Sequence, residues 1–519
     1  MKKFMLVFFT VLLSANLFGQ TSWSSPPQTL STLGVNASAP QIVIDPNANI
    51  TAVWLESTVV IANTLPSGGS WGTAVAISSS GASAPQIAVD PSGNVTAVWV
   101  QSTGIHSATL PSGGSWSSAT TLSAAGATAP QVAVDPSGDA AAVWESATGF
   151  IQASTKLFGG IWSIIPSTIS GSGASAPMVS VGGNGNVVVV WQAVNGSINT
   201  VYSASKIITA LTWGSAAAIS SVSHNAVQPT VFTGILGNAV AGWFRYDVIG
   251  SAYKNVLFDV AFLVNGTWLT SVDVSTVPGL TNPANLVSVI TIDSFGNALA
   301  AWTNSDDGSN IALKVAELLS NGTSTGTSEL VLDTSIHGLD LSSNSLGYTV
   351  LAYMANDTSS NLAIQTLDFN LEYASPGWNN PNIVSQGAFN GYPQLASTLT
   401  SNTTNNYALA WIHFDGTSNV IQAVTGTETL IAPPTSLTVT QTTDNRNVVT
   451  EYYNTLSWTA STDPNVDAYL IFRNGVEITA VSVNQYIDYN RSPSESVVYT
   501  VAAIDNLSNK SVNVNITFP

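Results

Sequence analysis

The chain contains no cysteine, and this absence removes several kinds of chemistry at once. No disulfide can brace the fold, no thiolate can bind zinc, and no cysteine can carry a lipid anchor. Histidine is also scarce, since His106, His224, His337 and His413 are the only four in 519 residues. A zinc site needs about three or four ligands, and no two of these histidines have ligand spacing. The sequence therefore predicts no metal and no cofactor.

Charge is equally sparse. Charged residues make up 8% of the chain, against about 25% in an average globular domain. Only 11 residues are basic and 29 are acidic, so the net charge is −18. Binding to nucleic acid or to an anionic membrane requires clustered lysine and arginine, and the sequence has no such cluster. Nucleic acid is therefore excluded as a partner.

Long apolar runs are lacking after the first 20 residues. Two lysines there precede an apolar run and small residues near Gly19, an order typical of a secretory signal peptide cleaved before Gln20. The alternative, an N-terminal membrane anchor, would need an apolar run of about 20 residues. We expect residues 1–19 to be a signal peptide, the mature chain to have no membrane span, and the protein to be secreted or held at the cell surface.

What the chain has in abundance is repetition. The phrase APQIAVDPSGNVTAVW at 84–99 returns with few changes at 39–54 and 129–144, and in weaker copies at 176–191, 228–243, 287–302, 339–353 and 392–411. The copies end on a large aromatic residue at intervals of 45, 45, 47, 52, 59, 51 and 58 residues. The closing aromatics are Trp54, Trp99, Trp144, Trp191, Trp243, Trp302, Tyr353 and Trp411.

Each repeat reads as four short strands. In the second copy Ile87 and Val89 share one face, a Pro-Ser-Gly-Asn turn follows, and Val95, Ala97 and Trp99 again share a face. A repeated four-stranded unit of this length is typical of a propeller blade, with a solenoid as the competing arrangement. The segment 21–31 reads as a fourth strand that precedes the first complete repeat, and the last repeat lacks one. We therefore predict an all-β, eight-bladed β-propeller over 21–431, closed by its N-terminal strand, with seven blades as the alternative.

The repeat pattern stops before residue 433, and a different set of motifs begins there. A Pro-Pro opening, Leu456-Ser-Trp458, the Asn474-Gly475 hairpin signal, Tyr486-Ile-Asp488 and Tyr499-Thr-Val501 follow in order. In these residues the segment 433–519 resembles a fibronectin type III β-sandwich along nearly its whole length. The whole chain thus resembles exported bacterial β-propeller proteins that carry such a module. For the module itself, the resemblance implies a spacer or a low-affinity adhesion unit and no catalysis.

Two other functions suggested by the repeats, sialidase activity and calcium binding, do not agree with the residues present. The D-x-x-G-N phrase is similar to the Asp-box of sialidases but differs in spacing, and a sialidase holds its acidic sugar with three arginines. Residues 21–431 contain one arginine, Arg245, which excludes that activity. Asp45, Asp90, Asp135 and Asp293 repeat at the first turn, but one carboxylate per repeat cannot supply the six to eight oxygens of a calcium site. We expect each Asp to accept hydrogen bonds within its own turn.

Polar residues recur just after each closing aromatic, where the second-to-third-strand loops of a propeller meet at one mouth of the channel. They are Glu56, Gln101, Glu145, Asn195, Asp247, Asp306, Asp307, Asp357 and Asp415. The last four repeats are longer and add distinctive side chains, which favours a ligand site there. The candidate ligand-binding residues are Arg245, Tyr246, Asp247, Asp306, Asp307, Asp357, His413 and Asp415, with Arg245 able to bind a ligand carboxylate or to pair with Asp247.

Three functions compete. A non-catalytic exported binding or adhesion protein, whose polar face meets a glycan or an extracellular protein, agrees best with the poverty of catalytic motifs. A glycoside hydrolase or lyase would need paired carboxylates, for which Asp247, Asp306, Asp307 and Asp415 are the available pool. A purely structural surface component would suit the nearly identical first three repeats. We favour binding or scaffolding, assign no catalytic residue, and leave the oligomeric state open.

Overall fold

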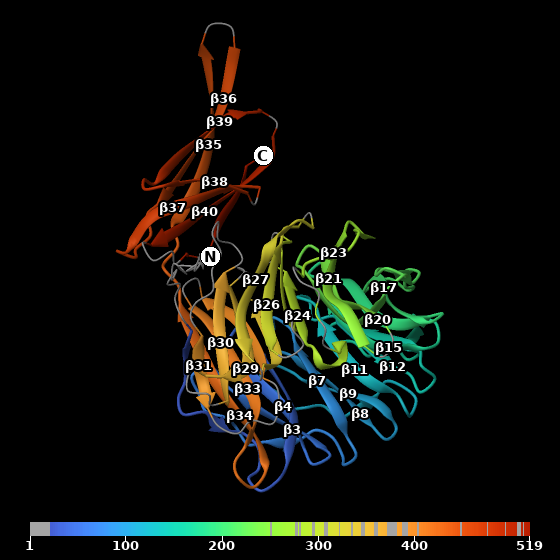
Figure 1. Cartoon of the computed structure of the whole chain (residues 1–519). Helices are drawn as coiled ribbons and strands as arrows, with labels where there is room; N and C mark the ends of the chain where they lie inside the picture. Colours follow the sequence, from blue (N-terminus) through green and yellow to red (C-terminus); the bar gives the residue numbers. More distant parts are fainter. Residues whose placement is uncertain are drawn as a thin grey trace, which may run out of the picture.

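The structure is a computed structural model of the whole chain (Figure 1). It describes residues 21–518 apart from 250–251, 276–278, 280–281, 293–295, 306–309, 321, 334–335, 344–347, 358–361, 371–380, 387–392, 402–403, 447–448, 475, 494, 506–509 and 512. The predicted signal peptide lies outside the described residues. Apart from one short 3₁₀ turn, η1 (Pro283–Asn285), the regular structure in the described part is all β.

The first four repeats each form one antiparallel sheet whose strands are neighbours in chain order. Sheet one contains β3 (Ala37–Ile44), β4 (Ile50–Glu56), β5 (Val59–Leu65) and β6 (Val75–Ala76). Sheet two contains β7 (Ser83–Val89), β8 (Val95–Gln101), β9 (Gly104–Leu110) and β10 (Thr120–Thr121). Sheet three contains β11 (Thr128–Val134), β12 (Ala140–Glu145), β13 (Ile151–Lys156) and β14 (Ser167–Thr168). Sheet four contains β15 (Ala174–Val181), β16 (Asn186–Asn195), β17 (Ile198–Ile207) and β18 (Ala217–Ala218).

The next four repeats follow the same strand order. Sheet five contains β19 (Asn225–Thr233), β20 (Ala239–Ile249), β21 (Ala252–Val264), β22 (Thr267–Trp268) and β23 (Val272–Asp273). Sheet six contains β24 (Ser288–Ile292), β25 (Ala298–Asn304), β26 (Ile311–Leu318) and β27 (Ser324–Asp333). Sheet seven contains β28 (His337–Ser343), β29 (Tyr348–Asn356), β30 (Leu362–Asn370) and β31 (Asn382–Gln386). Sheet eight contains β32 (Gln394–Ser401), β33 (Thr404–Phe414) and β34 (Asn419–Thr429).

The outer strand of sheet eight comes from the N-terminal segment. β1 (Ser22–Trp23) pairs with β34 through Ser22 opposite Thr427 and Trp23 opposite Gly426. β2 (Gln28–Thr29) pairs with the same strand through Gln28 opposite Ala423 and Thr29 opposite Gln422. Residues about 400 positions apart in sequence therefore complete one sheet, and the otherwise open edge of β34 is covered.

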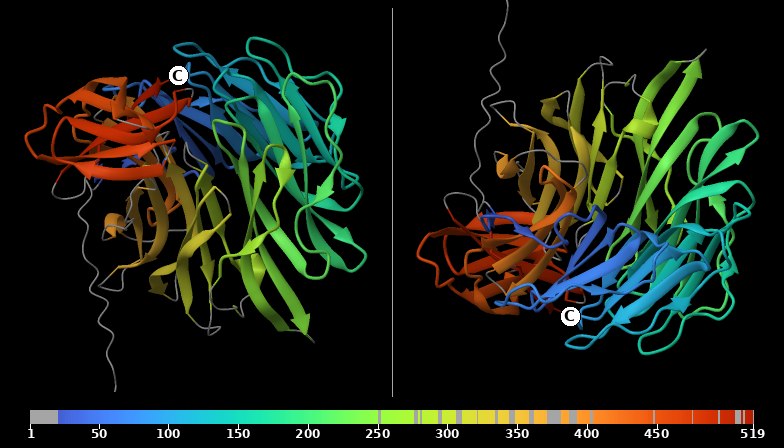
Figure 2. Two further views of the ribbon diagram at one scale, coloured as in Figure 1. Left: turned by 90° about the horizontal axis from the view of Figure 1, so that it is seen from above. Right: turned by 90° about the horizontal axis from the view of Figure 1, so that it is seen from below.

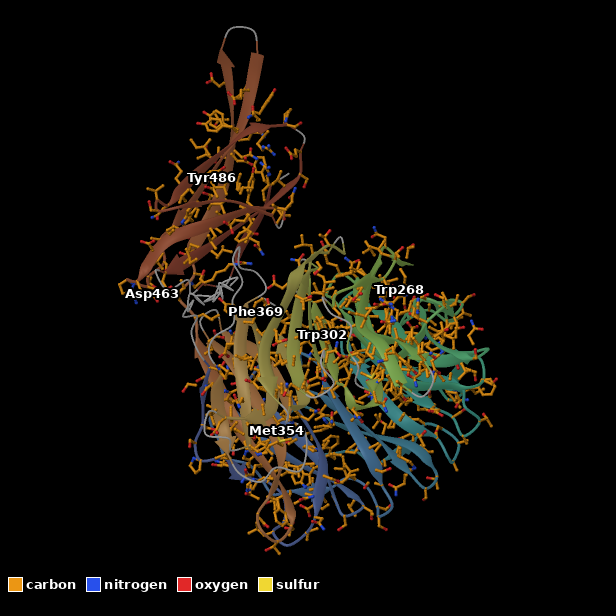
Figure 3. The ribbon with its side chains drawn as sticks, viewed as in Figure 1. Trp268, Trp302, Met354, Phe369, Asp463 and Tyr486 are labelled. Atoms are coloured by element: carbon orange, nitrogen blue, oxygen red, sulfur yellow. The ribbon has the colours of Figure 1, made fainter. Side chains whose placement is uncertain are left out.

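Each closing aromatic lies in the core that its sheet shares with the preceding sheet. The eight side chains are at most 1% exposed, and Trp54 of sheet one packs with Ala408 and Ile421 of sheet eight. Burying such a ring removes about 150–250 Å² from water and stabilises the fold by roughly 4 kcal/mol before entropy is counted. Trp302, labelled in Figure 3, is an example. Its ring is stacked on that of Phe258 of the preceding sheet, with 5.2 Å between the ring centroids. Sheets packed this way follow one another around a common centre, and the last packs on the first (Figure 2).

The backbone conformation of the first strand explains why the Ala-Pro pair recurs. In sheets one to four the alanine before the proline has a left-handed backbone, as Ala39 (φ 48°) and Ala84 (φ 47°) illustrate. The strand has a register shift at the same place, between Ser38 and Gln41 in sheet one. This bulge inserts one extra residue and turns Ala39 into the core shared with sheet two. A small residue limits the strain of that conformation, which costs about 1–2 kcal/mol.

The first turn of each early repeat is held by its aspartate, as the sequence predicts. Asp90 accepts hydrogen bonds from the backbone N–H groups of Ser92 (2.9 Å) and Asn94 (2.8 Å). Asp45 and Asp135 do the same in sheets one and three. Asp293 lies outside the described residues. In sheets one, two and three the repeated carboxylate therefore accepts hydrogen bonds from its own turn.

Residues beyond 431 form a second, two-sheet unit, called the C-terminal module here (Figure 1). One sheet has the order β35 (Thr435–Arg446), β36 (Val449–Thr459), β39 (Gln485–Arg491). The other has the order β38 (Val476–Val481), β37 (Val466–Arg473), β40 (Val497–Asp505), β41 (Val514–Phe518). Leu456 and Trp458 of the first sheet share a core with Ile471, Tyr499 and Val501 of the second.

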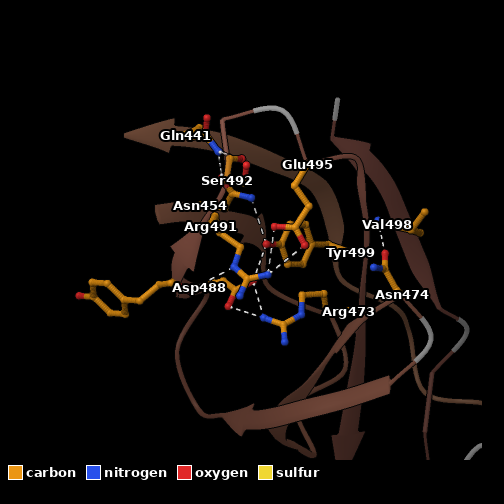
Figure 4. Close-up of polar contacts among 11 residues, drawn as sticks. Gln441, Asn454, Arg473, Asn474, Asp488, Arg491, Ser492, Glu495, Val498 and Tyr499 are labelled. Carbon is orange, nitrogen blue, oxygen red and sulfur yellow. Dashed lines mark hydrogen bonds and ion pairs between the residues drawn. The ribbon is translucent and has the colours of Figure 1, made fainter. Parts of the chain in front are cut away.

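A polar network also joins the two sheets of the C-terminal module (Figure 4). Buried Asp488 accepts hydrogen bonds from Arg473 Nη1 (2.9 Å) and from the Tyr499 hydroxyl (2.5 Å). Arg491 Nε lies 3.4 Å from the same carboxylate. Asp488 belongs to β39, whereas Arg473 and Tyr499 belong to β37 and β40. In a chain without cysteine, this charged contact is a non-covalent link between the sheets.

Strand direction gives the ring of sheets two distinct ends. Loops between second and third strands, together with the connections between sheets, lie at one end, called the free end. The other end carries the remaining hairpin loops and is called the module end, because β34 finishes there and leads into the C-terminal module. The Tyr348 hydroxyl, at the start of β29, donates a hydrogen bond to the Lys510 carbonyl at this end.

Candidate functional site

Two of the recurring polar residues at the free end serve the core. The Trp54 indole N–H donates to Glu56 (3.1 Å) and the Trp99 indole N–H donates to Gln101 (3.1 Å). In sheet three Trp144 donates instead to Gln152, which faces it from β13. A buried indole N–H is stabilised by an acceptor, so the polar residue two positions after the aromatic has a structural cause in the first two repeats.

The predicted ligand residues separate into different environments. Asp306 and Asp307 lie outside the described residues, and Asp357 and His413 are half-buried at the free end. Asp415 is exposed and accepts hydrogen bonds from the backbone N–H groups of Thr417 and Ser418, both at 2.8 Å. These neighbours lower the Asp415 pKa below its ordinary value. Asp415 therefore holds its own loop in the way Asp90 does.

Tyr246 belongs to the core between sheets five and six. Its side chain is buried and its ring lies 5.5 Å from that of Tyr253. Because successive side chains of a strand point to opposite faces, Tyr246 faces away from Arg245. Hydropathy could not have separated the two, since both follow Trp243 at the end of an apolar strand.

Arg245 has partners other than the one anticipated. Its Nε lies 2.9 Å from Asp259 on β21, and its Nη2 lies 3.3 Å from Asp273 on β23. Pairing with Asp247, one of the two roles considered for Arg245, is not among its ion pairs, because the guanidinium extends across the sheet to Asp259 and Asp273. Strand pairing places Asp259 opposite both Trp243 and Asp273, so the two carboxylates lie in one row beside the arginine.

Asp247 instead joins a second group at the free end. Its carboxylate lies 2.7 Å from Nδ1 of His224 and 2.8 Å from the Asn255 amide nitrogen. His224 comes from the connection between sheets four and five, whereas Asn255 lies on β21. We call the six residues His224, Arg245, Asp247, Asn255, Asp259 and Asp273 the sheet-five cluster.

The surroundings shift the pKa values of the carboxyl groups in this cluster in opposite directions. Burial raises the pKa of Asp259 to about 6 even though Arg245 opposes the rise. Burial also raises the pKa of Asp273. Asp247 has the opposite shift, since hydrogen bonds from Asn255 and His224 lower its pKa. Near neutral pH the cluster thus combines a fully ionised surface carboxylate with a buried carboxylate that titrates close to 6.

The hairpin that carries the cluster is longer than those of the first repeats. β20 and β21 pair out to Ile249 opposite Ala252, whereas β4 and β5 end at Glu56 opposite Val59. Its tip exposes Val248 (54%) and Ile249 (65%) to solvent. Exposed aliphatic groups therefore follow Asp247 at the free end, with Ile249 on the same face of the strand as Asp247 and Val248 on the other. The sequence signal for this feature was the 59-residue spacing before Trp302.

A hollow at the module end was not anticipated. It has a volume of about 380 Å³ and is lined by the first turns of sheets one to five, including Pro46, Pro91, Pro136 and Ile235. Asp90 and Asp135 also line it, but both are bound to their own turns. Apart from Thr233 and Gly183, the rest of the lining is aliphatic or proline, and the hollow lies at the opposite end of the sheets from the sheet-five cluster.

Within the described residues no group of three or more His, Asp or Glu side chains is arranged to hold a metal ion. In the same part of the chain no helix has the length and apolar character to cross a membrane.

No protein-family profile and no curated protein matches the chain by sequence. Among solved structures, a protein of unknown function from Dyadobacter fermentans is 11% identical with a TM-score of 0.37, over 77% of this chain and 100% of that one. Polysaccharide lyase Uly1 is 8% identical with a TM-score of 0.42, over 75% and 89%. A lectin of Aleuria aurantia is 12% identical with a TM-score of 0.33, over 59% and 97%. Likeness at this level assigns neither a family nor a function.

Proposed function

We propose that the chain is an exported, non-catalytic glycan-binding protein, built as an eight-bladed β-propeller followed by a fibronectin type III module. Eight sheets that share cores in sequence, with an N-terminal strand completing the last, support the propeller architecture. Two packed sheets of three and four strands support the sandwich. Residues 1–19 act as the signal peptide, residues 21–431 as the propeller and residues 433–519 as the module, with secretion or surface display as the destination.

The observation that carries the binding function is the extended hairpin of sheet five. It exposes Val248 and Ile249 at its tip, one and two residues beyond Asp247, whose carboxylate contacts His224 and Asn255. Ligand sites combine apolar contact area with a few oriented polar groups, and sugars offer both C–H faces and hydroxyls. Arg245 is neutralised by Asp259 and Asp273. The cluster therefore favours neutral sugars over acidic ones.

The test is a glycan array followed by titration of the best ligand. Replacing both Val248 and Ile249 by serine should weaken binding about tenfold or more, which corresponds to about 1.4 kcal/mol. A matched control replaces Ile164 and Ile165, which are exposed at the module end, by serine. This control should bind as the parent does.

If both variants lost the same affinity for the glycan, or neither lost any, the hairpin would not be part of the binding site. A hydrolysis and lyase screen of the same glycans distinguishes the remaining alternative. Turnover that disappears in Asp273→Asn while binding persists would establish a carbohydrate-active enzyme instead.

A further inference from the structure

The N-terminal strand begins at a cluster of buried polar side chains between sheets seven and eight. We call the residues Thr21, Asp368, Asn405, Tyr407 and Glu428 the latch. All five are at most 5% exposed. Asp368 lies on β30 of sheet seven, and the last three lie on β33 and β34 of sheet eight. The latch thus joins the first described residue of the chain to two sheets formed more than 300 residues later.

Hydrogen bonds hold Thr21 against sheet seven. Its backbone N–H and its hydroxyl both donate to the Asp368 carboxylate, the former at 3.4 Å. Its carbonyl accepts a hydrogen bond from Asn382 (2.9 Å), and the indole N–H of Trp23 donates to Thr366 (3.1 Å). By contrast, β1 and β2 contribute only two residues each to the ladder with β34. The attachment of the N-terminal strand therefore depends heavily on the contact with Asp368.

Glu428 lies in the same buried space. Its carboxylate accepts hydrogen bonds from the Asn405 amide and the Tyr407 hydroxyl, both at 2.9 Å. The donors to Glu428 and Asp368 are hydroxyl, amide and backbone N–H groups, all of them neutral. Two carboxyl groups in one buried site, without a cation among these donors, are costly to ionise together.

The protonation equilibria agree with this geometry. Burial raises the pKa of Asp368 to about 6, and burial together with the charge of Asp368 raises that of Glu428 to about 7. Among the residues that the structure describes, the other titratable groups that face the pair are Tyr407 and, next to it, Tyr348. Burial and the two carboxylates hold the pKa of Tyr407 well above its ordinary value, so its phenol stays neutral.

We propose that the latch is a pH-sensitive switch of ring closure, which holds the N-terminal strand while its carboxyl groups retain a proton and releases it when both are ionised. The sign follows from linkage. A carboxyl group whose pKa is raised by folding contributes stability below its ordinary range near 4 and loses that contribution as the pH rises through the folded value. The strand should therefore be firmly attached at pH 5 and loosened above pH 7.

The absence of native cysteine allows a clean local probe. Ser31 is buried after β2 and its hydroxyl accepts a hydrogen bond from the Ile421 N–H (2.9 Å). A thiol in Ser31→Cys should be protected while the strand is attached and accessible once it leaves. Ser203→Cys, buried in sheet four, is the control for the intrinsic pH dependence of the thiol.

The measurement is the maleimide labelling rate of Ser31→Cys divided by that of Ser203→Cys, in the full mature chain. This ratio should rise at least tenfold between pH 5.5 and pH 8.5. The Asp368→Asn/Glu428→Gln double variant keeps the shapes and removes both charges, so the rise should disappear. Cleavage before Gln20 puts an α-amino group one residue from Thr21, and its positive charge would favour the ionised form of Asp368. Parent and variants therefore all begin at Gln20, so that this charge is the same in each.

A constant ratio in the parent chain would overturn the proposal, and so would an equal rise in the double variant. If the double variant does not fold, the same labelling ratio is measured in the single variant Glu428→Gln. It removes one of the two charges and should reduce the rise several-fold, whereas an unchanged rise would refute the switch.

Discussion

The polar residues of this chain take their roles from partners on neighbouring strands, and Arg245 is the clearest case. Its guanidinium lies between buried Asp259 and exposed Asp273. The arginine offsets part of the cost of burying Asp259, whose pKa is already raised to about 6. The residue is therefore a structural element of sheet five as well as part of the candidate binding face.

Replacing Arg245 by alanine should destabilise the protein in a pH-dependent way. At pH 8 the loss should be about 3 kcal/mol, because Asp259 would remain buried without its cation. At pH 5 the carboxyl group can take up a proton, so the loss should be smaller. Thermal unfolding at both pH values measures the difference.

The double variant Arg245→Ala/Asp259→Asn removes the charge as well as its partner, and the pH dependence of the loss should then vanish. Lys254→Ala, on the same hairpin, should cost less than about 1 kcal/mol. A loss from Arg245→Ala that is equal at pH 5 and pH 8 would contradict the assignment of Asp259 as the affected group.

At the scale of elements, the first turns of successive sheets pack on one another. A Cβ added to Gly93 would lie 2.5 Å from the Asp45 carboxylate of the preceding sheet, and one added to Gly138 would lie 2.8 Å from Asp90. The aspartate that closes one turn thus lies against the glycine of the next turn. This contact explains why both residue types recur at fixed positions in the repeat.

Gly93→Ala should therefore cost more than Gly113→Ala in the same sheet. Both glycines have a positive φ, 84° and 67°, so each substitution pays about 1–2 kcal/mol for the left-handed backbone. Only Gly93 has a neighbour in the way, and the clash should add about 1–3 kcal/mol. Melting temperatures of the two variants test this, and equal shifts would show that the turns do not press on one another.

At the scale of the whole molecule, the N-terminal strand and the C-terminal module leave the ring at the same end, so the extended hairpin of sheet five lies at the opposite, free end. The module has a core of its own around Trp458 and Tyr499 and the polar network on Asp488. Both features lead us to expect a unit that folds without the ring.

Residues 433–519 expressed alone should melt in one cooperative transition. In that fragment Asp488→Asn should lower stability by about 2–3 kcal/mol, because two arginines lose their shared carboxylate. Asp467→Asn, at an exposed position, is the control and should leave the transition unchanged. A disordered fragment would mean that the module needs the ring to fold.

Much of the fold was readable because its determinants are local. Strand periodicity, the turn aspartates and the closing aromatics are each set by a few consecutive residues. Asp90 and Trp99 accordingly take the predicted positions in the turn and the core. The missing fourth strand of the last repeat also pointed to the segment that pairs with β34.

The candidate site was less accessible to such reasoning. Tyr246 and Arg245 are adjacent in sequence, yet one lies in the core and the other in the sheet-five cluster. Glu56 and Gln101 looked like a polar rim, but each accepts a hydrogen bond from a buried indole. Which neighbour a polar side chain meets depends on register, and a single bulge changes it.

The sequence by itself determined the repeat unit, its strands and the residues that fill the cores, since side-chain size and alternation act over short distances. Tertiary structure decided which charges meet. Asp259 and Asp273 reach Arg245 only through strand pairing, and Thr21 reaches Asp368 only because the ring returns the end of the chain to its beginning. Electrostatic partners are chosen by distance in space, and residues hundreds of positions apart become neighbours only after the sheets have assembled.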